Sequence, residues 1–301
     1  MKYVFIINPN SGKSELKDGL FEQLKKYEGK IEYSTFIGSS KESTIEYIQN
    51  YCKTHKEDTV FCACGGDGTL NAVVSAVIGF NNAIVTCFPC GSGNDFVKVY
   101  GGVNNFLNLD NIINGIETRI DVMKVNDKYS VNVTNFGFDA SVCDTANKVR
   151  RKKIIGGKRS YTTGIIKSIF TARRNKCRVV ADGEVLAEKR ILLSTVANGK
   201  YVGGAYLCAP RSNNEDGLLE VSVVKPISIF KFASLLGPYK VGKQLEDPKF
   251  KKCIKYCRAT RVTIDAPDNF KICLDGEIYT GPHFEIENMK QVLRFIKPKN
   301  S

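Results

Sequence analysis

The segment Gly65-Gly66-Asp67-Gly68-Thr69 carries the residue types that phosphate chemistry needs. It follows an apolar run and precedes a helix-like stretch, so its backbone N–H groups can converge on a phosphate without side chains in the way. A carboxylate beside a phosphate needs a cation between them, which predicts that Asp67 holds Mg²⁺ or a water near the anion. A glycine-rich turn without a ligand is the alternative, but three glycines around one carboxylate favour phosphate binding.

Two familiar nucleotide motifs do not fit this sequence. Gly12-Lys13-Ser14 resembles the end of a P-loop, but the leading glycine of that motif falls on Ile7. Gly91-Ser92-Gly93 opens like the dinucleotide fingerprint, whose last glycine or alanine falls on Phe96. Neither motif is assigned, and the phosphate-binding hypothesis depends on residues 65–69.

Strand and helix signals alternate through the first 120 residues. Apolar runs predict strands, and the stretches between them predict helices. The predicted strands cover residues 3–8, 31–37, 59–64 and 83–88, and the predicted helices cover 14–27, 43–55 and 70–78. Such alternation is typical of a three-layer α/β domain with a parallel sheet, which binds ligands at the carboxyl ends of its strands. Residues 65–69 and 89–95 would both lie at that edge.

Residues 121–290 are predicted to form a second, β-rich domain. Turn dipeptides separate short strand-like runs, a pattern typical of a β-sandwich or barrel. The runs cover residues 120–125, 129–135, 176–181, 185–196, 218–224, 261–265, 271–274 and 277–280, and helical patterns lie mainly at 141–151, 161–172 and 227–236. The predicted division is therefore residues 1–120, residues 121–290 with a basic helical insertion at 141–176, and a tail, residues 285–301, that we expect to pack back on the first domain.

Positive charge is concentrated in two stretches of this 301-residue chain, whose formal net charge is +13. Residues 148–176 contain eleven basic residues, residues 249–261 contain six, and neither stretch contains an acidic residue. Each basic residue near an anionic membrane contributes about 1 kcal/mol, so we expect these two basic patches to bind such a surface. A solvated helix face would carry the same charge. No nucleic-acid-binding motif accompanies the patches, and nucleic acid is not expected as a partner.

Composition and the lack of targeting signals favour a folded cytoplasmic protein. The chain is 43% hydrophobic and 25% charged, which excludes disorder, collagen and coiled coil. Its apolar runs are far shorter than the ~20 residues that span a bilayer, and its first residues lack a signal-peptide cleavage site. Together with the basic patches, this predicts a cytoplasmic protein that associates peripherally with the inner face of the membrane.

The eleven cysteines are interpreted as reduced core thiols. Cys87 and Cys90 have the spacing of redox pairs, and Cys253 and Cys257 could share a helix face. Two separate pairs do not make a four-ligand metal set, and only two histidines could complete one. A redox or metal role of Cys87 and Cys90 stays open at this point.

Ordered sequence blocks along nearly the whole chain match a known family. They are Asn8-Pro9-Asn10-Ser11-Gly12, residues 65–71, residues 89–96, Gly137-Phe138-Asp139-Ala140, Asn198-Gly199 with Gly203-Gly204, Asp216-Gly217 and Asp275-Gly276-Glu277. Through these blocks the chain resembles the diacylglycerol kinase catalytic domain family, in particular its bacterial soluble lipid kinases. The resemblance implies an N-terminal nucleotide domain of the NAD kinase and phosphofructokinase type and a C-terminal β-sandwich domain for the lipid.

The resemblance also implies an activity and its residues. The activity is ATP- and Mg²⁺-dependent transfer of the γ-phosphoryl group to a lipid hydroxyl, above all that of diacylglycerol, giving phosphatidic acid for phospholipid biosynthesis. The residues that match the family's ATP-phosphate contacts are Asn8, Ser11, Gly12, Gly65, Gly66, Asp67, Gly68, Thr69, Ser92 and Gly93. Asp67, Asp95 and Asp121 match carboxylates that organise Mg²⁺ and water, Asp216 matches a structural Mg²⁺ loop, and Glu277 matches the general base.

The base assignment has an internal competitor. Asp275-Gly276-Glu277 lies between two strand-like runs, and Asp182-Gly183-Glu184 does too. Asp-Gly between strands is a strong hairpin signal, so turn geometry alone explains either copy. Only its place in the family's order favours Glu277 over Glu184.

Other functions stay in competition with the lipid kinase. NAD kinases and phosphofructokinases share the Gly-Gly-Asp-Gly loop, so a kinase of a soluble substrate is one alternative. A lipid- or nucleotide-binding protein without turnover is another. The sequence does not decide which lipid alcohol would be phosphorylated, and it leaves a homodimer open.

Overall fold

The computed structural model describes residues 1–12, 14–151 and 175–299 and divides the chain into two compact units. Unit 1 consists of Met1–Val122 and Lys290–Ser301, and unit 2 of Met123–Met289. Each unit has a buried hydrophobic core of its own. The predicted helix at 161–172 and most of basic patch 148–176 lie outside the described residues.

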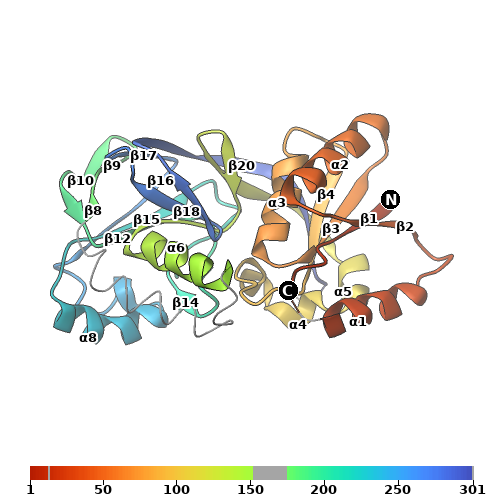
Figure 1. The fold of residues 1–301 in the computed structure, drawn as a ribbon, viewed down its shortest axis with the longest axis horizontal. Helices are drawn as coiled ribbons and strands as arrows, with labels where there is room; N and C mark the ends of the chain where they lie inside the picture. The colour runs from red at the N-terminus through yellow and green to blue at the C-terminus, as the bar shows by residue number, and fades with distance from the viewer. Residues whose placement is uncertain (13, 152–174, 300–301) are drawn as a thin grey trace. The chain divides into compact units, whose positions relative to one another are not determined.

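Unit 1 is built on a parallel sheet in the order β4-β3-β1-β2. The strands are β1 (Lys2–Ile7), β2 (Glu32–Ile37), β3 (Thr59–Gly65) and β4 (Ala83–Pro89), and all residues of β3 and β4 are buried. Helices α2 (Lys41–Thr54) and α3 (Asp67–Val77) lie on one face, and α1 (Ser14–Lys25), α4 (Val103–Phe106) and α5 (Leu109–Ile113) lie on the other (Figure 1). The expected three-layer α/β fold is confirmed.

The last strand, β20 (His283–Lys297), contributes its final part to unit 1. Phe295 pairs with Val85 of β4 in parallel orientation. Its side chain is fully buried and contacts the rings of Phe96, Tyr100 and Phe106. The end of the chain therefore completes the core beside β4.

Unit 2 contains two antiparallel sheets. The first is six-stranded in the order β16-β15-β12-β7-β18-β19. Its strands are β7 (Val133–Gly137), β12 (Leu193–Ala197), β15 (Leu219–Val224), β16 (Ile254–Ala259), β18 (Lys271–Leu274) and β19 (Glu277–Thr280). The second joins β9 (Arg178–Ala181), β10 (Glu184–Ala187), β17 (Arg261–Asp265) and the first part of β20.

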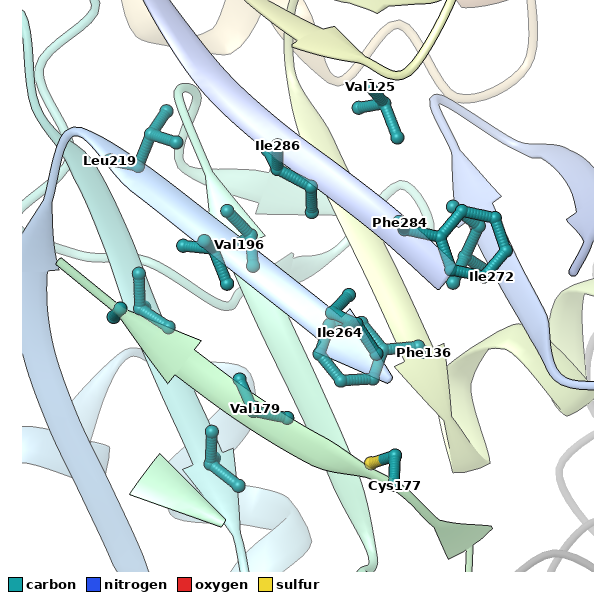
Figure 2. Close-up of a cluster of buried hydrophobic side chains, with 14 of the residues drawn as sticks. Val125, Phe136, Cys177, Val179, Val196, Leu219, Ile264, Ile272, Phe284 and Ile286 are labelled. Carbon is teal, nitrogen blue, oxygen red and sulfur yellow. The ribbon is translucent and has the colours of Figure 1, made fainter. Parts of the chain in front are cut away.

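Side chains from both sheets form the core of unit 2. Phe136 and Val196 from the first sheet and Val179, Ile264 and Ile286 from the second belong to one cluster of buried residues (Figure 2). Alternate residues of each strand point inward, as expected for two packed sheets. This arrangement is the predicted β-sandwich.

Shorter elements and two helices complete unit 2. The helices are α6 (Phe138–Arg151), which begins three residues before the predicted 141–151, and α8 (Ile229–Lys240). The short elements are the 3₁₀ helix η2 (Lys243–Leu245) and the strands β6 (Lys128–Ser130), β8 (Asn175–Lys176), β11 (Arg190–Ile191), β13 (Tyr201–Val202) and β14 (Tyr206–Leu207). Strand β5 (Ile116–Val125) crosses the division between the units.

Several predicted boundaries were wrong. The single strand expected at 185–196 is divided among β10, β11 and β12, because Glu188 and Lys189 interrupt it. The shared helix face proposed for Cys253 and Cys257 does not exist, since Cys257 lies in strand β16 and Cys253 precedes it.

Candidate active site

Three loops follow the carboxyl ends of β1, β3 and β4 in unit 1. The parallel registers place Ile7 beside Cys64 and Gly65 beside Pro89, so the strands end together. The N–H of Asn8 donates to the Cys64 carbonyl at 3.1 Å, and the N–H of Cys90 donates to the Gly65 carbonyl at 2.8 Å. Residues 8–12, 65–69 and 90–95 therefore form one loop cluster at this edge, which we call the strand-end cluster.

Glycines allow the loops of the strand-end cluster to touch through their backbones. Gly12 has a φ of +67°, and a Cβ added to it would lie 1.5 Å from the Cys90 carbonyl oxygen. A Cβ on Gly91 would lie 2.4 Å from the Gly66 Cα. These glycines bring loops together, whereas Gly68 is exposed, with nothing within 4 Å of a Cβ placed there. Gly68 is thus a glycine that keeps space open above the loop.

Asp67 is the first residue of α3 and is held by the loop after β4. Its Oδ1 accepts hydrogen bonds from the N–H of Asp95 at 2.8 Å and of Phe96 at 3.4 Å. A Cβ on Gly93 would lie 2.8 Å from the Asp67 Oδ2. Asp95 itself is buried and forms an ion pair with Lys98, three residues along the chain. The structure therefore brings Asp67, Gly93 and Asp95 together.

Polar side chains line the neighbouring part of the cluster. The Asn8 Nδ2 donates to the Thr69 Oγ1 at 3.1 Å, and the Asn8 Oδ1 accepts from the Asn10 N–H at 2.9 Å. Ser11 is partly exposed, and its Oγ would lie 3.6 Å from a Cβ placed on Gly66. Ser92 is exposed on the third loop. Hydroxyl, amide and carboxylate groups thus surround the amino end of α3, where helix N–H groups favour an anion.

Asp121 is placed differently from Asp67 and Asp95. It is fully buried in β5, and its Oδ1 accepts from the backbone N–H of Gln291 at 2.7 Å. Across residues 1–12, 14–151 and 175–299, no three His, Cys, Asp or Glu side chains form a group that could hold a metal ion. The oxygen donors of Asp67, Asn8 and Thr69 suit a hard cation such as Mg²⁺, but a protein-only cage is not present among these residues.

Glu277 lies in unit 2, at the start of β19. Leu274 pairs with Glu277 across a two-residue turn, in which Asp275 and Gly276 have φ values of 46° and 95°. This is the hairpin that the Asp-Gly signal predicted. The Tyr279 hydroxyl donates to the Glu277 Oε2 at 2.8 Å, which fixes the carboxylate.

The competing Asp-Gly-Glu segment forms the same turn. Ala181 pairs with Glu184, and Asp182 and Gly183 have φ values of 44° and 87°. The surroundings differ, because the Gly276 carbonyl accepts from the Asn147 Nδ2 of α6 at 3.0 Å, whereas the Asp182 carboxylate accepts from the backbone N–H groups of Thr260 and Arg261 at the start of β17. Glu184 is exposed, while Glu277 is partly buried. The turn before Glu277 thus contacts a helix, and the turn before Glu184 contacts a strand.

Asp216 has a basic partner in unit 2. It forms an ion pair with Arg258, and its Oδ1 accepts from the Leu218 N–H at 2.9 Å. Arg258 belongs to basic patch 249–261, whose Arg261 pairs with Glu285. Lys249, Lys251 and Lys252 of this patch are exposed.

The structure accounts for Cys87 and Cys90 without redox chemistry. All eleven cysteines are described, none is in a disulfide, and nine are buried, with Cys143 and Cys257 partly exposed. Burial raises the pKa of the Cys90 thiol to about 11 and raises that of Cys87 well above its ordinary value. Both thiols are therefore protonated at neutral pH, as expected of core thiols.

Sequence reasoning missed two features of these sites. Lys98 was not singled out, although its position three residues after Asp95 is the spacing at which helical side chains meet. Asp139 was quoted without a role, yet it lines an apolar pocket of unit 2. In the described part of the chain, no helix combines the length and apolar content needed to cross a membrane.

Comparisons with known proteins agree with this architecture. Residues 2–125 match the family described as "diacylglycerol kinase catalytic domain". Residues 132–297 match the family described as "YegS C-terminal NAD kinase beta sandwich-like domain". The diacylglycerol kinase of Bacillus subtilis (strain 168) is 26% identical over 303 residues, covering 98% of this chain and 95% of that protein.

Two further relatives extend the comparison. A protein of Pectobacterium atrosepticum named "Probable lipid kinase YegS-like" is 28% identical, with 94% of this chain and 92% of that protein covered. A crystal structure described as a diacylglycerol kinase from Bacillus anthracis str. Sterne has a TM-score of 0.73 at 20% identity, with 98% of this chain and 96% of that chain covered. The latter establishes likeness of fold. With both of its domains matched, this chain belongs to the diacylglycerol kinase and YegS-like lipid kinase family.

Proposed function

We propose that this protein transfers the γ-phosphoryl group of ATP to the hydroxyl of a membrane lipid, with diacylglycerol as the acceptor and phosphatidic acid as the product. The observation that carries the proposal is the strand-end cluster, in which three loops surround Asp67 and the amino end of α3. The family to which the chain belongs supports kinase chemistry. The names of the relatives support a lipid as the acceptor.

Phosphoryl transfer needs charge neutralisation, alignment of the reacting groups and an acceptor for the hydroxyl proton. Backbone N–H groups at the start of α3, around Gly66 and Gly68, would bind phosphate oxygens without needing side chains. Asn8 and Thr69 are held to each other at 3.1 Å and would position these oxygens.

Asp67 is the residue that we propose to hold Mg²⁺ beside the phosphates. When bound, Mg²⁺ would neutralise charge on the β- and γ-phosphates. The carboxylate is suited to this role, because two backbone N–H groups orient it before any ligand arrives. Asp95, Asp121 and Asp216 stay in the proposal as family matches, although Asp95 forms an ion pair with Lys98 and Asp216 forms one with Arg258.

Glu277 is our candidate for the general base. Its support is the order of its surroundings, since the preceding turn is docked on α6 and Tyr279 orients its carboxylate. A base must be held in place to reach the proton that it takes. Glu184 is exposed, and the turn before it contacts the start of β17 instead of a helix.

A lipid acceptor requires contact with a membrane, and unit 2 has suitable features. Phe230 of α8 is 85% exposed, and Lys249, Lys251 and Lys252 are exposed in the segment after it. Leu235 of α8 packs with Phe250 and Cys253 of that segment, so the helix and the lysines are neighbours. An exposed aromatic ring beside lysines is typical of proteins that lie at an anionic lipid interface. We propose peripheral association with the inner face of the membrane.

The proposal is tested with the full-length protein, labelled ATP and Mg²⁺. Diacylglycerol, monoacylglycerol and a sphingoid base are presented in mixed micelles, and NAD is presented in solution. We expect labelled phosphatidic acid, lost when Mg²⁺ is removed by chelation. Labelled NAD phosphate without labelled lipid would establish a soluble substrate instead. Folded protein that labels none of these acceptors would contradict the proposal.

A further inference from the structure

Two cysteines of unit 2 lie beside the turn that precedes Glu277. Cys143 belongs to α6, and Cys273 belongs to β18, two residues before the turn begins at Asp275. Helix α6 packs against β18. Cys143 is partly exposed, whereas Cys273 is buried, with 5% of its surface accessible. A thiol that solvent can reach therefore lies beside one that it cannot reach.

The alternation of side chains along β18 turns Cys273 toward α6. Ile272 and Leu274 belong to the buried core between the two sheets. Lys271 and Cys273 therefore lie on the other face of the strand. On that face, the Lys271 Nζ forms an ion pair of 2.7 Å with the Asp144 Oδ2 of α6. The face of β18 that carries Cys273 is thus the face that the helix covers.

Both sulfur atoms contact the same residue of the turn. The Cys143 Sγ donates a hydrogen bond to the Gly276 carbonyl at 3.2 Å. The Gly276 backbone also forms a hydrogen bond with the Cys273 thiol, and the two thiols are hydrogen-bonded to each other. Gly276 directly precedes Glu277, the candidate base. The two thiols therefore touch each other and the residue before the base.

The surroundings of the two thiols decide which of them reacts first. The hydrogen bond with Cys143, together with burial, raises the pKa of the Cys273 thiol well above its ordinary value, so this thiol is protonated at neutral pH. The thiolate is the form of cysteine that reacts with an oxidant. Cys143 is therefore the thiol that meets a reagent from solution, and Cys273 is placed to resolve the product as a disulfide.

We propose that hydrogen peroxide converts Cys143 and Cys273 into a reversible disulfide, and that this bond slows phosphoryl transfer by moving the turn before Glu277. The Cys143 thiolate attacks the peroxide and its O–O bond breaks, which gives a sulfenic acid and a hydroxide that takes up the proton lost by Cys143. The Cys273 sulfur then attacks the sulfenic sulfur, the S–O bond breaks, and the hydroxide leaves as water with the Cys273 proton. Two thiols lose two electrons, and the peroxide is reduced to two waters.

The disulfide changes the contacts of the turn. Its two sulfur atoms lie about 2.05 Å apart, which is closer than thiols in contact, so both side chains must move toward each other. Cys143 also loses the hydrogen that it donates to the Gly276 carbonyl. A catalytic group displaced by about 1 Å can lower a rate about 10²-fold. The effect on turnover rests on the proposed function, in which Glu277 is the base, whereas the disulfide is a property of unit 2 alone.

The experiment treats the full-length protein with a small excess of hydrogen peroxide, which catalase then removes. One portion is denatured, its remaining thiols are blocked with N-ethylmaleimide, and its peptides are analysed by mass spectrometry. We expect two thiols fewer than the eleven of the untreated chain, and a peptide pair that joins position 143 to position 273. In a second portion, phosphorylation of diacylglycerol should be about tenfold slower and should recover with dithiothreitol.

Other cysteines of the chain provide the controls. Cys143→Ser and Cys273→Ser should each prevent the disulfide and the fall in rate, measured against the same variant before treatment, and Cys273→Ala serves if serine is not tolerated at that buried position. Cys257→Ser removes the other partly exposed thiol and should leave the disulfide unchanged. Cys62 and Cys64, whose sulfurs are 3.9 Å apart in the buried core of unit 1, should stay reduced in the same sample.

Failure of this inference and failure of the proposed function give different results. If lipid is phosphorylated, yet the treated protein keeps its eleven thiols or Cys143 is oxidised without joining Cys273, the inference is wrong and the kinase stands. If the disulfide forms but no lipid is phosphorylated before or after treatment, the thiol pair stands and the proposed function fails. If the disulfide forms and the rate is unchanged, the link between this pair and turnover is overturned.

Discussion

The Asp67 carboxylate accepts a hydrogen bond of 2.8 Å from the backbone N–H of Asp95. This bond joins the start of α3 to the loop after β4, two segments separated in sequence by α3 and β4. One oxygen of Asp67 is thus committed to holding the loop, and the other lies near Gly93. The same carboxylate therefore serves the architecture of the site and, in our proposal, its chemistry.

Substitutions of Asp67 separate these two roles. Asp67→Asn keeps an oxygen that can accept from the Asp95 N–H but loses the negative charge. We expect this variant to fold normally and to lose lipid phosphorylation by about 10²- to 10³-fold, the usual effect of removing a preorganised electrostatic group. The measurement is initial rate with labelled ATP, alongside thermal denaturation.

Asp67→Ala should be inactive and also less stable. Without an acceptor, the Asp95 N–H loses its partner, which costs about 1–3 kcal/mol in a buried setting. Equal stability of the alanine and asparagine variants would show that the bond to Asp95 does not hold the loop. Full activity of Asp67→Asn would remove the metal role.

Gly12→Ala should force loops of the strand-end cluster apart. The new methyl group would collide with the Cys90 carbonyl, and the positive φ would strain it as well. We expect unfolding free energy to fall by more than about 2 kcal/mol, together with loss of ATP binding. Urea denaturation and nucleotide titration measure the two effects.

Gly29→Ala is the matched control for that collision. Gly29 has a φ of +72°, close to that of Gly12, but nothing lies within 4 Å of an added Cβ. Gly29→Ala should lower the free energy of unfolding by only about 1 kcal/mol, the strain of a positive φ. If both variants are destabilised equally, contact between the loops is not what requires glycine at position 12.

Gly68→Ala should make the protein more stable and a poorer binder of ATP. Gly68 lies inside α3 with open space around its Cα, so alanine should raise the unfolding free energy by about 0.5–1 kcal/mol through helix propensity. The methyl group would occupy the space above the loop that we assign to phosphate. We expect KM for ATP to rise several-fold. An unchanged KM would place the phosphates elsewhere.

Asp139 should make stability depend on pH. Its pKa is raised from an ordinary value of 3.8 to about 7 in the folded protein. Between these values the folded state keeps a proton that the unfolded state has released, so the stability due to this group is complete below 3.8 and is lost as pH rises to about 7. The free-energy difference between Asp139→Asn and the original chain should therefore grow in favour of the variant over this range. Guanidinium unfolding at several pH values measures it, and a constant difference would contradict burial of the carboxyl.

Glu277→Gln should lower turnover strongly, while Glu184→Gln should leave it unchanged. The two glutamates follow turns of the same geometry, so both variants should keep their hairpins and their stability. Loss of the base should lower kcat about 10²- to 10⁴-fold with little change in KM for ATP. The reverse outcome, with Glu184 essential, would reassign the base.

The architecture of unit 1 could be predicted from sequence because its central strands β3 and β4 are mostly apolar runs that end in glycine and proline. All residues of β3 and β4 are buried, which is the pattern of strands covered on both faces. The strand-end cluster follows from the parallel order alone. The need for glycine at position 12 could not be predicted in this way, because it depends on how closely its loop approaches Cys90 in space.

Unit 2 was harder to predict in detail. Strand β16 was missed because Lys255 and Arg258 expose long charged side chains along it, and only its last residue is fully buried. The pocket beside Asp139 could not be predicted, since it exists only when α8 packs near α6 and the first sheet. Periodicity indicates which face of a helix is apolar but not whether the facing space is filled.

Strand β20 belongs partly to unit 2 and partly to unit 1. This has a consequence for how the chain folds while it is synthesised. Phe295 completes an aromatic cluster with Phe96, Tyr100 and Phe106, yet it leaves the ribosome almost two hundred residues after them. Domains made first usually fold first during translation. Unit 1 therefore cannot complete its core until β20 is synthesised, so a prematurely terminated chain would expose that cluster to quality-control proteases.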